Sequence, residues 1–206
     1  MKSFRGPKGK IVRRFGINIF ESRKYDKILD KRPSPPGMHG AKRRRAKMSE
    51  YGRQLTEKQK LKFCYGTTEK QFRGYYEKAS VRKGPTGVIL LQFLELRLDN
   101  VVYRAGYATT RAQSKQLVSH SHVLVNGKKV NIPSYIVKPG DVIEFRNKEA
   151  TKKMTEAYAS ENNWRDVPGW MKSDKNALKC EIIRIPERTE IPNIADEQLV
   201  VELFSK

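Results

Sequence analysis

The middle of the chain carries apolar residues at helical spacing, punctuated by capping signals. Ser49 is placed to cap a helix that runs to about Tyr65. Thr68 and Gln71 then have the spacing of a capping box, in which each residue satisfies a free amide of the first helical turn. An amphipathic stripe follows, made of Phe72, Tyr75, Tyr76 and Ala79. These signals predict two consecutive helices.

The next apolar stripe predicts a helix of about three turns that Gly106 ends. The stripe consists of Leu94, Leu98, Val101, Val102 and Ala105. Another face of the same helix is polar and carries Arg97, Asn100 and Arg104. We therefore expect one amphipathic helix with a basic face.

A shorter helix follows, because Thr110 and Gln113 offer another capping box and the pattern continues to about His120. One polar row on this helix consists of Arg111, Lys115 and Ser119, while Ala112, Leu117 and Val118 are left to pack. The two helices together predict a helix–turn–helix.

After these helices the period changes to that of strands. Residues 122–125 read as a strand, and Asn126-Gly127 is a strong signal for a tight hairpin. The segment 138–141 has Pro and Gly where a type II turn requires them, and a short strand over 142–145 follows. The block 94–150 thus predicts two short helices and a small antiparallel sheet.

The two ends of the chain are less regular. Residues 1–47 are basic and rich in Gly and Pro, and their large apolar side chains argue against a fully solvated tail, so we expect an extended arm ordered by RNA. The tail from Thr151 begins as a helix and ends in two strand-like runs, 180–185 and 198–204.

Charge narrows the choice of partner. The chain has 206 residues, of which 32% are charged, and its net charge of +21 favours a polyanion, either nucleic acid or an acidic membrane surface. Residues 1–50 carry a net +12, whereas residues 151–206 carry −1. The last quarter therefore has no electrostatic reason to approach phosphates, and we expect it to face protein or solvent.

The sequence gives little support to other classes of protein, namely membrane, secreted, metal-binding or cofactor-binding proteins. We expect no membrane span, because no apolar run approaches about 18 residues, and no secretory signal, because the start of the chain lacks an apolar segment. Cys64 and Cys180 match no zinc spacing, and we interpret them as two reduced thiols. No metal-ligand cluster or phosphate-binding glycine loop stands out, so we expect no cofactor.

Catalysis has one candidate, Asp99. The segment Arg97-Leu98-Asp99 is similar to the Arg-Leu-Asp motif of pseudouridine synthases, in which the aspartate is catalytic. A catalytic carboxylate needs a supporting cleft, and no second domain of catalytic size remains in the chain. We therefore favour the alternative, a surface carboxylate on an amphipathic helix that is paired with a nearby arginine.

The positive charges are spread over an arm, loops, two helices and a hairpin, which suits a folded RNA better than a membrane or the major groove of DNA. The side chains that we expect to contact RNA are basic or polar and lie in the arm and in the central block. They are Arg13, Arg14, His39, Arg43, Arg44, Arg45, Arg97, Asn100, Arg104, Arg111, Gln113, Lys115, Gln116, Ser119, His120, His122, Asn126 and Lys128.

The chain resembles one family throughout its length, the bacterial-type small-subunit ribosomal protein S-four (uS-four). The segments 97–106, 110–113, 116–120, 125–128 and 139–143 are similar to the family's S-four, or alpha-L, RNA-binding domain. The flanking segments 36–40, 57–61, 69–73, 131–135 and 197–202 resemble the ribosomal protein. Certain relatives hold zinc with a cysteine cluster near the N-terminus, but this chain has no cysteine before Cys64, so we expect no zinc there.

The resemblance implies an α+β fold, in which an S-four module of two short helices and a small antiparallel sheet is inserted into a mainly helical domain behind a basic, irregular arm. We expect the arm at 1–47, the module at 94–150 and the helical domain, with C-terminal strands, at 48–93 and 151–206.

The resemblance also implies a ribosome-bound, cytoplasmic or organellar protein that binds small-subunit rRNA early in assembly. Its implied partners are ribosomal protein S-five and mRNA near the entry channel, and its implied role is in translational accuracy. Two alternatives remain at this point: an RNA-modifying enzyme that carries an S-four domain, and a stand-alone RNA-binding regulator of translation.

Overall fold

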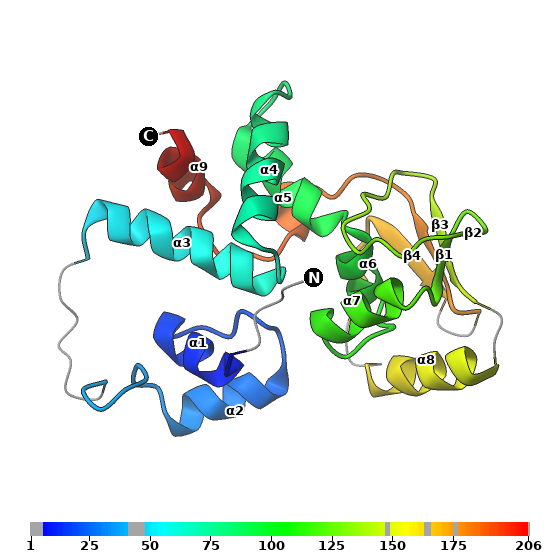
Figure 1. Ribbon diagram of the computed structural model, residues 1–206, viewed down its shortest axis with the longest axis horizontal. Coiled ribbons are helices and arrows are strands. Elements are labelled where there is room, and N and C mark those ends of the chain that lie inside the picture. The colour runs from blue at the N-terminus through cyan, green and yellow to red at the C-terminus, as the bar shows by residue number, and fades with distance from the viewer. Residues whose placement is uncertain (1–5, 41–47, 147–148, 163–165, 175–176, 206) are drawn as a thin grey trace. The chain divides into compact units, whose positions relative to one another are not determined.

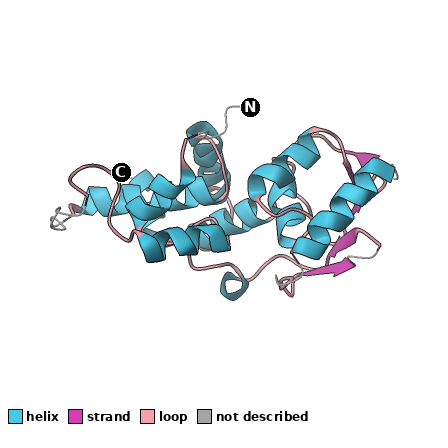
Figure 2. Cartoon of the chain, turned by 90° about the horizontal axis from the view of Figure 1, so that it is seen from below, coloured by secondary structure: helices cyan, strands magenta, loops and turns pink. Residues whose placement is uncertain are grey.

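A computed structural model describes residues 6–40, 48–146, 149–162, 166–174 and 177–205 of the chain. It divides into two compact units, one of Met1–Gly87 with Asn193–Lys206 and the other of Val88–Pro192 (Figure 1). Within the described residues the first unit is helical and the second holds the strands, which group together in Figure 2. The α+β class expected from the sequence is confirmed.

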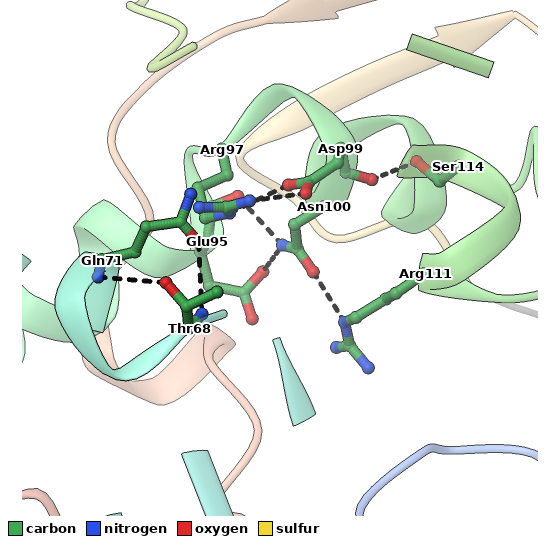
Figure 3. Close-up of polar contacts among 8 residues, drawn as sticks. All are labelled: Thr68, Gln71, Glu95, Arg97, Asp99, Asn100, Arg111 and Ser114. Carbon is green, nitrogen blue, oxygen red and sulfur yellow. Dashed lines mark hydrogen bonds and ion pairs between the residues drawn. The ribbon is translucent and has the colours of Figure 1, made fainter. Parts of the chain in front are cut away.

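The described part of the first unit is built from helices. They are α1 (Lys8–Phe15), α2 (Arg23–Lys31), α3 (Glu50–Cys64), α4 (Glu69–Ser80) and α9 (Glu197–Ser205). As predicted, the Ser49 hydroxyl caps α3, and Thr68 and Gln71 form a reciprocal capping box on α4 (Figure 3). Between these two helices Gly66 adopts a positive φ of 61°, which suits the residue just past a helix end.

The N-terminal segment is not the extended arm that we expected, at least over residues 8–31. Helices α1 and α2 pack together, and Ile11, Val12 and Ile19 are buried. Arg13 donates from Nε to the Ser34 carbonyl at 2.9 Å and thereby joins α1 to the turn after α2. The expectation was wrong because this segment forms two helices and buries Ile11, Val12 and Ile19, which an extended arm would leave exposed.

The predicted strand over 198–204 is also wrong, because this segment forms α9. In α9, Val200 is buried and the Phe204 ring stacks on Tyr76 of α4 at a centroid distance of 4.6 Å. The Gln54 amide of α3 donates to Glu202 at 3.0 Å. A short, nearly continuous apolar run does not distinguish strand from helix by period, and here the contacts with α3 and α4 decide.

The second unit combines helices with a mixed-length antiparallel sheet. The helical elements are α5 (Thr86–Glu95), whose first two residues belong to the first unit, α6 (Leu98–Arg104), α7 (Arg111–Ser119), α8 (Glu149–Glu161) and the 3₁₀ turn η1 (Arg188–Glu190). The strands are β1 (Val123–Val125), β2 (Lys128–Lys129), β3 (Val142–Phe145), β4 (Met171–Asp174) and β5 (Lys179–Ile182), in the order β2-β1-β3-β5-β4.

The core of this unit lies between the sheet and the α6–α7 pair. Alternating strand residues such as Val123, Ile143 and Ile182 are fully buried, and they join Leu98 and Val118 from the two helices in one hydrophobic cluster. This alternation is what a sheet with one covered face requires. The hydrophobic cluster therefore fixes α6 and α7 on the sheet.

The single helix predicted from Leu94 to Ala105 is wrong, because the chain breaks between α5 and α6. At the break Arg97 forms a β-bridge with Ile136, and the Leu98 amide donates to the Tyr135 carbonyl at 2.8 Å. The pairing partner lies almost 40 residues further along the chain. The spacing of apolar residues around the break therefore could not reveal it.

The predicted turns are confirmed. Asn126 and Gly127 have φ values of 50° and 74°, as a type I′ hairpin requires, and Gly140 has a φ of 85°, as a type II turn requires. The Asn126 side chain bonds across to the second turn, donating to Asp141 at 2.8 Å and accepting from the Val142 amide at 2.9 Å. The two turns are thus tied together.

The C-terminal part divides differently from the predicted domains. Residues 151–192 lie in the unit that holds the sheet, because β5 pairs with β3 and β4 pairs with β5. Trp170 and Cys180, from this part, belong to the core. Of the two strand-like runs, the first is confirmed as β5 over Lys179–Ile182, and β4 was not anticipated.

Both cysteines are free and buried. Burial raises the pKa of the Cys180 thiol to about 12, and the charge of Glu181 adds to the effect. We therefore expect a maleimide at pH 8 to label Cys180 in the native protein roughly a thousandfold more slowly than an ordinary thiol. The chain unfolded in urea, followed by mass spectrometry, provides the reference. Rapid native labelling at this position would contradict the packing described here.

The described residues contain no helix that is both long enough and apolar enough to cross a membrane. They also contain no group of three or more His, Cys, Asp or Glu side chains arranged to hold a metal ion.

Candidate nucleic-acid interface

A buried charge network surrounds the start of α6. Its members come from the end of α5, the break and α6 itself, and each residue is nearly inaccessible to water. They are Glu95, Arg97, Asp99, Asn100 and Arg104, with exposed fractions between 1% and 8%. Figure 3 shows how most of them point toward one another.

Two ion pairs of matched geometry make up the charged part of the network. The Arg97 guanidinium donates to both oxygens of Asp99, at 3.0 and 2.6 Å. The Arg104 guanidinium donates to both oxygens of Glu95, at 3.1 and 2.9 Å. Such two-point pairing compensates buried charge effectively, and the four charges sum to zero.

The predicted surface position of Asp99 is wrong, although its predicted pairing with an arginine is confirmed. Only 4% of Asp99 is exposed, and its carboxylate is occupied by Arg97. Its carbonyl also accepts a hydrogen bond from the Ser114 hydroxyl of α7. Asp99 therefore holds α6 and α7 together.

Three residues predicted to contact RNA belong to this interior network: Arg97, Asn100 and Arg104. Side chains so little exposed offer almost no surface to a polyanion, so the geometry favours a structural role for them. Glu95, which completes the network, was missed. A single acidic residue inside the apolar run of α5 was the available signal, because an unpaired charge is rarely buried.

Asn100 links the network to the surface of α7. Its amide nitrogen donates to the Glu95 carboxylate at 2.6 Å and to the Glu95 carbonyl at 2.9 Å. Its amide oxygen accepts from Nε of Arg111 at 2.9 Å (Figure 3). The Arg111 guanidinium also lies over the ring of Tyr103, with Cζ 4.4 Å from the centroid, a cation–π arrangement.

The rest of α7 is largely as predicted. Thr110 caps the helix, because its side chain accepts from the Gln113 amide. The Gln113 side chain accepts from the amide and the hydroxyl of Thr109, at 2.7 and 2.6 Å, so only half of the predicted capping box forms. Gln116 is exposed, and so is Ala112, which was wrongly expected to pack. The structure thus leaves part of this helix open to solvent.

Lys115 is half-buried on α7. Burial lowers the pKa of its ammonium group, Asp99 opposes this effect and Arg97 adds to it. Lys115 thus lies close enough to the buried Arg97–Asp99 pair to be affected by both charges.

The end of α7 and the hairpin carry the remaining candidates of the second unit. Ser119 and His120 are exposed, and His122 contacts the Thr151 hydroxyl of α8 through Nδ1 at 3.2 Å. Asn126 and Lys128 are exposed at the β1–β2 turn.

The N-terminal candidates are divided. Arg14 and His39 are exposed, whereas Arg13 donates a hydrogen bond to the Ser34 carbonyl within the N-terminal segment. The candidates Arg43, Arg44 and Arg45 lie outside the described residues. The structure adds exposed basic residues on α2 that were not predicted, namely Arg23, Lys24, Lys27 and Lys31. Three of them recur every fourth residue, which was a readable signal of one helical face.

Known proteins match this chain over its length. Residues 3–95 match the family described as "Ribosomal protein S4/S9 N-terminal domain", and residues 96–143 match the "S4 domain". A small ribosomal subunit protein uS4 of Akkermansia muciniphila is 50% identical over 206 residues, covering 100% of both chains. Another of that name, from Borrelia duttonii, is 48% identical over 200 residues, covering 97% of this chain and 96% of the relative.

The chain belongs to the uS4 family of small-subunit ribosomal proteins. It is thus a structural, rRNA-binding component of the ribosome and not an enzyme. The Arg-Leu-Asp motif lies in the segment that matches the S4 domain, and its aspartate is enclosed by the network described above. The S4 domain match begins at residue 96, where the chain breaks between α5 and α6.

Proposed function

We propose that this uS4 chain binds small-subunit rRNA through α7, the β1–β2 turn and the exposed basic face of the N-terminal helices. One observation carries the proposal: between Asp99 and Asp141 the sequence contains no acidic residue. This stretch includes the cations Arg104, Arg111, Lys115, Lys128, Lys129 and Lys138. Arg104 is matched by Glu95 in the interior, so the surface of α7 and of the turn has a positive field.

We further propose that the chain binds early in assembly of the subunit and contributes to translational accuracy beside ribosomal protein S-five and the mRNA entry channel. The charge distribution supports a protein-facing role for the C-terminal part, since residues 151–206 carry a net −1. The ribosome concerned is then cytoplasmic in a bacterium, or organellar.

The rRNA interface is tested by removing the two turn lysines. We expect K128A/K129A to weaken binding to a transcript of small-subunit rRNA. The slope of the logarithm of affinity against the logarithm of salt concentration should fall in magnitude by about two, because each lysine neutralises about one phosphate. The matched control is K172A/K179A, which removes two exposed lysines from β4 and β5 of the same sheet. Equal effects of the two pairs, or no effect of the first, would count against the proposed surface.

Association with the ribosome separates a structural component from a loosely bound regulator. We expect the full chain to co-sediment with small subunits after a wash in high salt, and footprinting on naked rRNA should locate its contacts. Complete release by the wash would favour the regulator.

A further inference from the structure

A buried side chain connects the interior charge network with α7. The Asn100 residue is 2% exposed, yet it is bonded at both ends of its amide. On the inner side lies the Glu95 carboxylate, and on the outer side lies the Arg111 guanidinium. Asn100 thus connects a buried anion with a cation of the proposed interface.

The direction of these hydrogen bonds determines the orientation of the amide. A carboxylate and a carbonyl only accept hydrogen bonds, so Glu95 requires the amide nitrogen of Asn100 to face inward. The amide oxygen must then face outward, where it accepts from Nε of Arg111 at 2.9 Å. Glu95 is itself held by Arg104, so the orientation is set by a buried ion pair.

The guanidinium of Arg111 is therefore held from two sides. Asn100 fixes the Nε edge, and Cζ of the guanidinium lies over the buried ring of Tyr103, 4.4 Å from its centroid. A free arginine loses considerable rotamer freedom when it binds, at a cost of about 0.5–1.5 kcal/mol for one immobilised side chain. A guanidinium that is already held loses less of this freedom on binding and presents a fixed planar donor to a phosphate or a base.

We infer that Asn100, oriented by Glu95, is a positioning residue that pre-orders Arg111 for rRNA. This inference rests on the proposed rRNA-binding function and deepens it. The cost of ordering one side chain corresponds to a factor of about two to twelve in affinity. We therefore expect N100A to weaken rRNA binding by roughly three- to tenfold through Arg111 alone.

A double-mutant cycle tests this coupling with the full-length chain and transcribed small-subunit rRNA. N100A should weaken binding in the presence of Arg111 and add nothing in an R111A background. The matched control is N162A, which removes an equally buried asparagine whose amide donates to the carbonyls of Gly106 and Tyr158. For the control, the effects of N162A and R111A on affinity should multiply. If the effects of N100A and R111A on affinity also multiply, Asn100 is merely structural and the inference fails.

A second variant does not depend on the folding of N100A. R111K keeps the charge but lacks the planar Nε edge that Asn100 holds, and Arg111 lies at the surface end of the network. We expect R111K to lose most of the affinity that R111A loses, whereas retention of affinity in R111K would show that charge alone matters. If R111A has no effect while the wild type binds, the positioning role is overturned but the rRNA interface stands. If the wild type binds rRNA no better than an unrelated RNA, the proposed function itself fails.

Discussion

Raising monovalent salt from 50 to 200 mM should weaken binding to small-subunit rRNA by about a thousandfold, if six or more phosphates are engaged. The reason is release of the counterions that lysine and arginine displace from the RNA. The described interface offers enough cations for this on α2, α7 and the β1–β2 turn. Filter binding across this salt range, with the logarithm of affinity plotted against the logarithm of salt, measures the slope.

The K172A/K179A variant is a useful reference in this titration, because it lowers the net charge without touching the proposed surface. Its slope should match that of the wild type. An affinity of the wild-type chain that stays flat across the salt range would contradict the electrostatic basis of the interface.

Replacing Glu95 by glutamine should lower the free energy of unfolding by about 3–5 kcal/mol, because it leaves the Arg104 guanidinium buried without its counter-charge. The substitution preserves side-chain shape, so little of this loss is due to packing. Urea denaturation at constant pH and salt measures the change.

Two comparisons isolate the cause. E149Q removes a carboxylate from the exposed Glu149–Lys153 pair of α8, and it should change stability little because solvent screens such pairs. Adding R104M to E95Q should restore part of the loss, since no unpaired charge then remains. A loss below about 1 kcal/mol for E95Q alone would show that the network tolerates an uncompensated arginine better than its burial indicates.

Features determined by neighbouring residues were predictable from the sequence. The caps at Ser49 and Thr68, the end of α6 at Gly106 and the Asn126-Gly127 hairpin all depend on contacts within a few positions. The overall balance of charge, and with it a polyanionic partner, also follows from composition. The family resemblance likewise rested on short local segments, such as 97–106 and 125–128, and the comparisons confirmed it.

The failures at α6, at α9 and in the sheet share a cause, which is pairing between distant segments. The break before α6 depends on the bridge from Arg97 to Ile136, and the helical state of α9 depends on packing against α3 and α4. The sheet likewise gains β4 and β5 from beyond the predicted module. The spacing of apolar residues within a single segment does not reveal these contacts.

The candidate interface shows the same division. Sequence alone offered α7, the hairpin and a set of arginines as candidates, and it correctly paired Asp99 with a neighbouring arginine. Only the tertiary structure separated Arg97 and Arg104, which neutralise buried carboxylates, from Arg111, which Asn100 holds at the edge of the network. The physical reason is that all three arginines have the same charge and similar spacing, whereas burial and the position of Glu95 determine what each charge can reach.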